Sequence, residues 1–273
     1  MAPVTEPEPV DDVPDATSST PLTLPVSPVG EHRLRPAVLG TAALAAGLVA
    51  AAALVGYPAT IGLAVVLALV LAGTWPSAGG SVTPAQTSLI LAVSGVLIVL
   101  SALRADLLWT AAAVAAGIVL SFFHQLMRRP LRTGLVLSLL ASFGGLVLMA
   151  SGATMATLAH DPETRGSVVV AMVAVVAGLL GDVLVVAPPL RPFLSTVALL
   201  AAVAGALLAS SWFDRVSALD AASLGAAAGA LSWSLRRVLS GQAAILGARG
   251  QVASGLGSVL VVGALVHLFA IIS

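Results

Sequence analysis

Four ionisable side chains lie inside long apolar stretches of this 273-residue chain, and nearly all other charged residues lie between those stretches. The four are His124, Asp182, Asp220 and His267. A carboxylate or an imidazole in an apolar helix is costly unless it meets a partner or water, so such residues are candidates for binding, proton transfer or catalysis. Which chemistry each one supports depends on its depth and its neighbours.

Asp182 is the strongest candidate. It lies about five residues from the inner end of a predicted helix, and His124 has a similar depth in another helix. Arg128, Arg236 and Arg237 are expected near the same membrane face. We therefore predict an inner polar cluster that joins Asp182 to His124 or to one of these arginines. The alternatives are a structural ion pair, an interfacial carboxylate, and a substrate or proton site.

Asp220 and His267 form a second, outer set. Asp220 lies about four residues from the outer end of its predicted helix, and His267 lies in the outer third of the last predicted helix. The two side chains can meet only if their helices are neighbours. The other possibility is that each reaches headgroup water alone.

Composition defines the elements that position these residues. The chain is 59% hydrophobic and 9% charged, with a mean hydropathy of +1.08, whereas soluble domains carry about 25% charged residues. From Pro36 onward, apolar stretches of about 17–25 residues follow one another, the length that spans a bilayer. Spans this long without alternating polarity are helices, because lipid requires internally satisfied backbone. The sequence thus predicts an all-α, polytopic transmembrane bundle of about nine spans: 36–56, 59–74, 85–103, 107–126, 134–158, 167–187, 192–210, 216–235 and 252–272.

The arginines orient this set, since cytoplasmic loops are enriched in basic residues. With the N-terminus inside and the C-terminus outside, the outer loops hold only Arg104, Arg165 and Arg215. The alternation fits nine spans at every loop, although span 59–74 is short and its full crossing stays open. The inner segments then hold Arg33, Arg35, Arg128, Arg129, Arg132, Arg191, Arg236, Arg237 and Arg249.

The N-terminal segment before the predicted spans differs from them in composition. Residues 1–30 are rich in Pro, Ser and Thr, carry five acidic residues and no basic one, and are predicted to be a disordered cytoplasmic tail. Residues 31–273 form the predicted transmembrane domain.

Several chemistries find no support. The chain has no Cys, which excludes disulfides and thiolate catalysis, and its zero net charge gives no case for nucleic acid. It has no P-loop, G-x-S-x-G or H-E-x-x-H motif, and we expect neither metal nor cofactor.

Arg128, Arg129 and Arg132 are placed to contact anionic headgroups. The lipid bilayer is therefore the one predicted partner, and the oligomeric state stays open.

Small and aromatic residues suggest how the helices pack. Gly225 and Gly229 form a GxxxG pair that favours close intramolecular packing, with a homodimer contact as the alternative. Helix breaks are expected only at loops, which argues against a transporter built on broken helices. Trp75, Trp109, Trp212, Trp233 and Tyr57 fall near predicted span ends and are interpreted as an interfacial aromatic belt.

One stretch resembles a known group. Phe123-His124-Gln125-Leu126-Met127-Arg128-Arg129, between two spans rich in small residues, resembles uncharacterised actinobacterial multi-spanning membrane proteins, and Thr74-Trp75-Pro76 fits the same pattern. The resemblance implies a bacterial plasma (inner) membrane location and no particular activity.

Two functions compete on this basis. The first is a non-enzymatic membrane protein, either a transport component or a cell-envelope scaffold, which fits the scarcity of reactive groups. The second is a lipid-modifying transferase that uses Asp182, His124 and the nearby arginines at the inner face. Phosphoryl chemistry normally needs several carboxylates for metal or a charged clamp, so the non-enzymatic interpretation is preferred.

Overall fold

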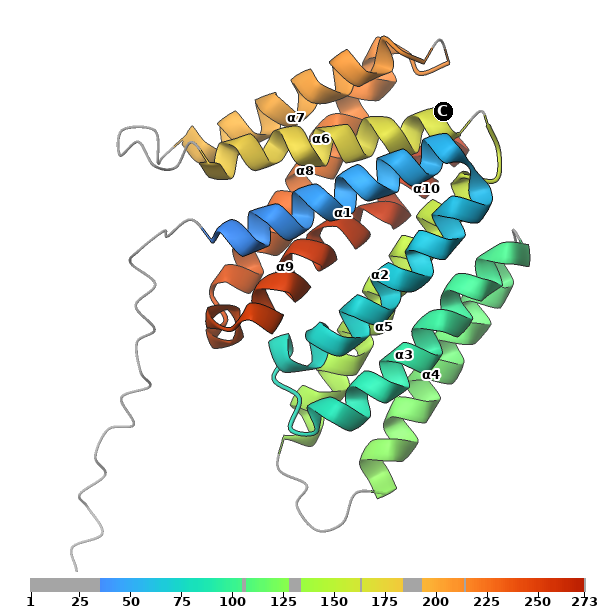
Figure 1. Ribbon diagram of the computed structural model, residues 1–273, viewed down its shortest axis with the longest axis vertical. Helices are drawn as coiled ribbons and strands as arrows, with labels where there is room; N and C mark the ends of the chain where they lie inside the picture. Colours follow the sequence, from blue (N-terminus) through green and yellow to red (C-terminus); the bar gives the residue numbers. More distant parts are fainter. Residues whose placement is uncertain are drawn as a thin grey trace, which may run out of the picture. The chain divides into compact units, whose positions relative to one another are not determined.

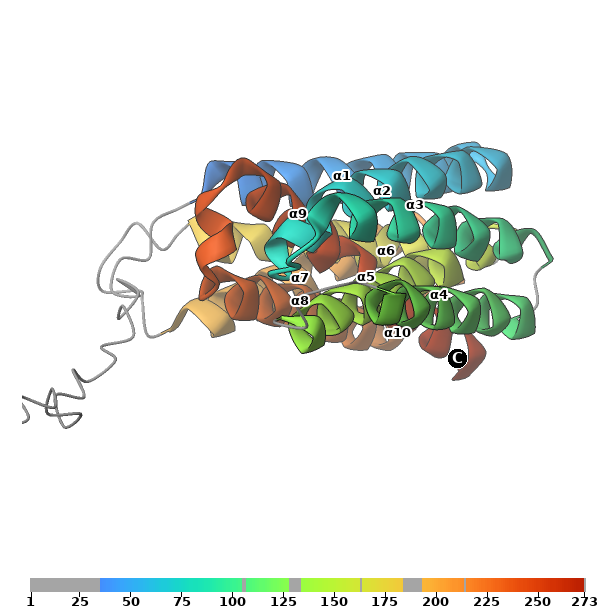
Figure 2. The same cartoon turned by 90° about the horizontal axis from the view of Figure 1, so that it is seen from below.

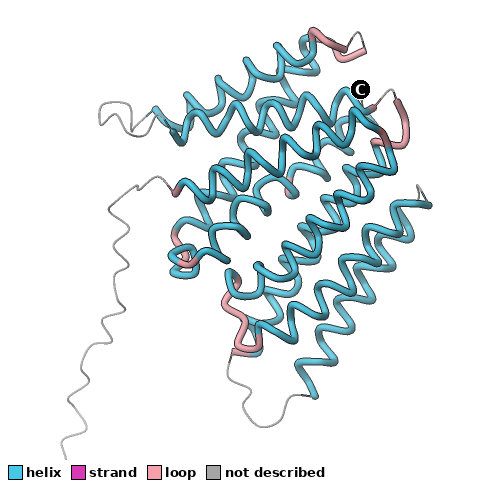
Figure 3. Tube along the Cα trace, viewed as in Figure 1, coloured by secondary structure: helices cyan, strands magenta, loops and turns pink. Residues whose placement is uncertain are grey.

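The computed structural model describes residues 35–104, 107–127, 134–162, 164–183, 193–213 and 215–272, and these residues fold as α-helices joined by short connections (Figures 1 and 3). Residues 1–30 and the arginines Arg128, Arg129 and Arg132 lie outside the described residues. The helices are α1 (Pro36–Val55), α2 (Tyr57–Ala78), α3 (Pro84–Ser101), α4 (Leu107–Met127), α5 (Leu135–Leu158), α6 (Arg165–Val183), α7 (Leu194–Ser210), α8 (Ala218–Ser240), α9 (Ala248–Leu260) and α10 (Val262–Ile272).

Consecutive helices run in alternating directions from α1 to α9, and in a view at right angles they lie nearly parallel (Figures 1 and 2). The helices form two groups that pack side by side. Helices α2 to α5 pack on one another, while α6 packs on α1, α7 and α8. Helix α9 links the groups because it contacts α1, α2 and α8, and every residue from Ala253 to Leu260 is buried.

Seven segments in the described part of the chain are long and apolar enough to cross a membrane. They are α1, α2, α3 with its short 3₁₀ extension, α4, α5, α6 and the combined segment Ala248–Ile272. Helix α7 is shorter, with 17 residues, and α8 carries three charged residues. Large apolar side chains such as Leu44, Leu108 and Leu200 are exposed on the outside of the bundle, as expected for a surface that faces lipid.

The second predicted span is longer than the sequence suggested. Helix α2 has 22 residues rather than the 16 of 59–74, and it continues through Trp75 and Pro76, beyond the predicted end of the span. The chain turns away only afterwards, where the N–H of Gly79 donates to the Trp75 carbonyl at 2.8 Å. This helix is therefore long enough to span a bilayer.

Trp75 explains the extension, and its assignment to an interfacial belt is wrong. The side chain is only 7% exposed, and its indole Nε1–H donates to the carbonyl of Ala141 in α5 at 2.8 Å. The ring lies where a Cβ on Gly144 or Gly145 would be within 3.2 Å of it. Two glycines of α5 thus open a slot for a buried tryptophan that anchors the end of α2.

Close packing through small residues joins α6, α7 and α8. A Cβ on Gly181 would lie 2.7 Å from the Cα of Ala198, and one on Gly225 would lie 3.1 Å from the carbonyl oxygen of Ala202. A Cβ on Gly229 would overlap the Ala202 side chain. The GxxxG pair of α8 is therefore used inside the chain, against α7, as the favoured interpretation expected.

The ninth span is interrupted, contrary to the expectation that breaks occur only at loops. Helix α9 ends at Leu260 and α10 begins at Val262. The hydroxyl of Ser151 in α5 donates to the Val261 carbonyl at 3.0 Å and accepts from the Ala264 N–H at 2.8 Å. Gly263 permits this approach, because a Cβ there would overlap the Ser151 backbone. A neighbouring serine thus satisfies the backbone groups that the break frees, as lipid requires.

Candidate functional site at the α6–α8 interface

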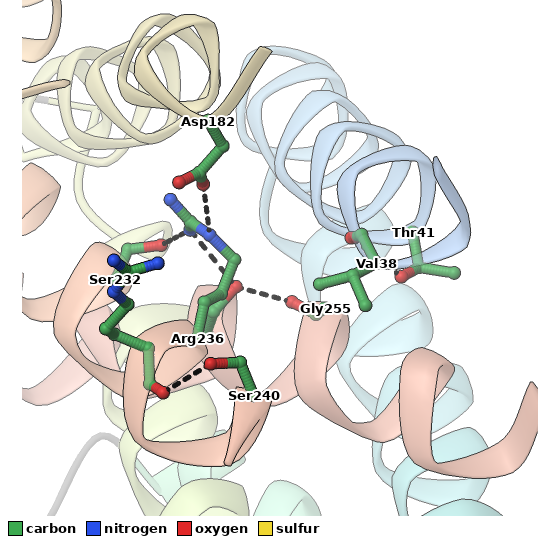
Figure 4. Close-up of polar contacts among 9 residues, drawn as sticks. Val38, Thr41, Asp182, Ser232, Arg236, Ser240 and Gly255 are labelled. Atoms are coloured by element: carbon green, nitrogen blue, oxygen red, sulfur yellow. Dashed lines mark hydrogen bonds and ion pairs between the residues drawn. The ribbon is translucent and has the colours of Figure 1, made fainter. Parts of the chain in front are cut away.

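An ion pair connects α6 and α8. The Nε–H of Arg236 donates to Oδ2 of Asp182 at 3.0 Å, and the two side chains point toward each other across the interface (Figure 4). Arg236 is 6% exposed and Asp182 25%. A buried guanidinium without a counter-charge would be strongly destabilising, so Asp182 supplies the counter-charge that Arg236 needs in this interface.

Two serines also hydrogen-bond to the guanidinium. Nη1 of Arg236 donates to the hydroxyl of Ser232 at 2.6 Å and reaches the hydroxyl of Ser258 in α9 at 3.5 Å. Ser258 itself donates to the Gly255 carbonyl at 2.7 Å. Ser232 precedes Arg236 by one helical turn, and helical side chains lean toward the N-terminus. The arginine therefore folds back over Ser232 rather than extending to the end of the helix.

Glycine packing sets the register of the pair. A Cβ on Gly178 would lie 4.0 Å from the Cα of Gly229, so α6 and α8 approach closely at this level. The two helices run in the same direction (Figure 1), with Asp182 four residues beyond Gly178 and Arg236 seven residues beyond Gly229. Those offsets are about 6 and 10 Å of helix. The backward lean of the arginine closes the difference and brings its Nε to the carboxylate.

The contact between α9 and α1 closes the other side of this cluster. A Cβ on Gly255 would lie 2.6 Å from the Val38 carbonyl oxygen and would overlap the Thr41 hydroxyl, and Figure 4 places these residues beside the ion pair. Gly255 is thus required for α1 and α9 to meet. Packed helices therefore bury the guanidinium of Arg236, whereas the carboxylate side of Asp182 stays a quarter exposed.

The other predicted inner residues do not join Asp182. His124 lies on α4, which packs against α3 and α5 and stands away from α6 in Figure 1. Its Nδ1 is buried and has no hydrogen-bond partner in the described part of the chain. Arg237 is exposed, and its guanidinium lies over the Trp233 ring at 5.8 Å. Arg128 lies outside the described residues. Among the members of the predicted set that the structure describes, Asp182 and Arg236 are the two that it brings together.

The outer pair is not formed either. Helices α8 and α10 are neighbours, as a meeting of Asp220 and His267 required. However, the Asp220 carboxylate accepts from the Ser217 hydroxyl at 2.7 Å, while the Ser217 oxygen accepts from the Asp220 N–H at 3.1 Å. The two residues cap the start of α8. Nδ1 of His267 is buried without a partner among the described residues.

Sequence reasoning overlooked both serines. Ser232 carried a usable signal, because a serine four residues before a buried arginine lies on the same helix face. Ser258 carried none, since its place beside Arg236 depends on how α9 packs against α8. No group of three or more His, Asp or Glu residues that could hold a metal ion occurs in the described ranges.

The long apolar helices define a polytopic membrane protein of all-α architecture. No protein-family model matches the chain, and no curated protein and no solved structure matches it either. The class of protein therefore follows from the helices themselves, and activity has to be argued from the geometry of the site.

Proposed function

We propose that the protein is a non-enzymatic component of the bacterial plasma (inner) membrane, and that it acts as an envelope scaffold. The observation that carries the proposal is the Asp182–Arg236 pair, which is packed between helices and hydrogen-bonded to serines. Such a pair holds α6 to α8. A catalytic carboxylate would instead face a substrate, with His124 and further basic groups beside it.

We further propose nine membrane passes with the N-terminus in the cytoplasm and the C-terminus outside. The positions of the described arginines support this orientation. Arg35, Arg236, Arg237 and Arg249 lie at the ends of helices on one side of the bundle. Arg104, Arg165 and Arg215 lie at the opposite ends, and the more basic side is expected in the cytoplasm.

A transport component is the second candidate, and the interruption at Val261 is the observation that favours it. Discontinuous helices expose backbone groups that bind substrates or ions in many transporters. Here the Val261 carbonyl accepts from Ser151, so the freed group is occupied within the chain. Because this carbonyl already has a partner, we prefer the scaffold to the transport component.

Paired replacement of the two charges tests the main proposal. Asp182→Leu alone leaves a buried guanidinium unpaired and should cost about 3 kcal/mol, whereas replacing both members of a buried pair by apolar residues is often neutral. We expect Asp182→Leu to lower the amount of folded protein in the membrane, and Asp182→Leu with Arg236→Met to restore it. The matched control is Arg237→Met, which removes an exposed arginine from the same turn.

Growth and lipid profiles of a deletion strain that carries each variant then distinguish a structural role of the ion pair from a chemical one. For a scaffold, a gene that encodes the folded double variant should complement the deletion as well as the wild-type gene does. A double variant that is abundant and folded, yet leaves the strain and its lipid profile identical to the deletion, would contradict the proposal. That result would favour chemistry or proton-coupled transport at Asp182.

A further inference from the structure

A cavity of about 560 Å³ opens at the end of the bundle opposite to the Asp182–Arg236 pair. It is lined by the α5–α6 connection, by the α7–α8 connection with the first turns of α8, and by the end of α10. Binding sites for small molecules commonly occupy 300–1,000 Å³, so this cavity has the volume of a ligand site. It plays no part in the function proposed above.

The lining combines charges of both signs with an apolar wall. Asp161, Asp220 and Arg215 contribute the charges, and the half-buried Val216 and Phe269 contribute the apolar surface. Asp161 and Arg215 also make contacts elsewhere in the chain, so a ligand would join an existing network. Within the described part of the chain, Asp220 bonds through Oδ2 to Ser217, which leaves its Oδ1 directed to no other residue.

The walls are held in place by hydrogen bonds and packing. The Nε–H of Arg165 donates to the Ala159 carbonyl at 2.8 Å, and the Thr164 hydroxyl donates to the Leu158 carbonyl. The α5–α6 connection is therefore fastened to the end of α5. Phe213 of the other connection lies where a Cβ on Gly166 would be 3.2 Å from its ring. The two connections thus form one preorganised rim.

We propose that this cavity binds a zwitterion in which a short chain joins a phosphate to an ammonium group. A guanidinium recognises phosphate by paired hydrogen bonds, which assigns the phosphate to Arg215. The carboxylates of Asp161 and Asp220 take the ammonium group. All lining elements are helix ends or connections, which places the cavity at the depth of lipid headgroups. Val216 and Phe269 then face the attached carbon chain.

Two sources share this chemistry, the headgroup of phosphatidylethanolamine and soluble phosphoethanolamine. The first arm of the test places the full-length protein in nanodiscs of phosphatidylethanolamine and phosphatidylglycerol and measures by native mass spectrometry which lipid it retains. The second arm measures binding of phosphoethanolamine to the detergent-solubilised protein by calorimetry, with ethanolamine and inorganic phosphate as separate probes. Retention of phosphatidylethanolamine identifies the lipid as the source, and binding of phosphoethanolamine alone identifies the soluble compound.

Variants assign the recognition to the cavity. Arg215→Gln and Asp220→Asn should each weaken binding of the preferred zwitterion about tenfold, whereas Arg104→Gln, in another connection at the same end, should leave it unchanged. Asp161→Asn replaces Asp220→Asn if the latter lowers the melting temperature. The proposal is overturned if neither arm detects the zwitterion, if phosphatidylglycerol is retained equally well, or if Arg215→Gln binds as the wild type does.

Discussion

Substitution of Gly263 by alanine tests the interrupted span directly. Gly263 lies where α10 meets α5, and an added Cβ would overlap the Ser151 backbone. The backbone of α5 cannot yield as a flexible side chain would, so the two helices must separate. Separation also breaks the two hydrogen bonds of the Ser151 hydroxyl, to the Val261 carbonyl and from the Ala264 N–H. A change of one methyl group should therefore destabilise the protein.

The magnitude follows from three contributions. Overpacking in a close-packed interior costs about 1–3 kcal/mol, and two hydrogen bonds within a membrane protein contribute about 0.6 kcal/mol each. Alanine is favoured over glycine in a helix by about 1 kcal/mol, which offsets part of the loss. The net destabilisation is about 1–3 kcal/mol, and a domain of this size loses about 2–4 °C of melting temperature for each kcal/mol.

The assay is the melting temperature of the purified protein in detergent, followed by intrinsic fluorescence and by aggregation. Gly73→Ala in α2 is the matched control, because its added Cβ would meet no atom within 4 Å. We expect Gly263→Ala to melt several degrees below the wild type and Gly73→Ala to melt at or above it. Equal melting of the two variants would refute the argument that the break depends on close approach of α5 and α10.

Two further predictions concern packing elsewhere in the bundle. Trp75→Phe keeps an aromatic ring but removes the hydrogen bond to the Ala141 carbonyl. It should lower the free energy of unfolding, measured by chemical denaturation, by about 1 kcal/mol. The control Trp212→Phe, at an exposed position, should leave that free energy unchanged. Gly229→Leu should destabilise the monomer by forcing α8 away from Ala202 of α7, without changing the oligomeric state in size-exclusion chromatography with light scattering. A loss of dimer caused by Gly229→Leu, with unchanged melting, would show instead that this glycine packs between subunits.

The class of fold was predictable from the sequence because the bilayer restricts the possibilities. Unbroken apolar segments must satisfy their own backbone, so they form helices, and their lengths locate the spans closely. The main error was at Trp75-Pro76, because the second span was predicted to end at Thr74 and α2 continues to Ala78. Gly144 and Gly145, which open the slot in α5 for the tryptophan, lie 69 and 70 residues further along the chain, and no local pattern indicates the contact.

The candidate site was predictable only as a set of alternatives. Asp182 in an apolar segment requires a partner, and the sequence offered His124 and several arginines. The choice of Arg236 depends on which helices are neighbours, and glycine and alanine contacts between α6, α7 and α8 decide that. His124 has equal chemical suitability but lies on α4, which packs elsewhere.

By itself the sequence determined that this chain is a helical, multi-spanning membrane protein with very few buried charges, since composition and segment length are enough for that conclusion. Only the tertiary structure decided that Asp182 meets Arg236, that Asp220 caps its own helix beside a cavity, and that the last span breaks at Val261. The reason is physical. Hydrophobicity places a segment in the bilayer without choosing its neighbours, whereas close contacts of small residues and single hydrogen bonds choose them.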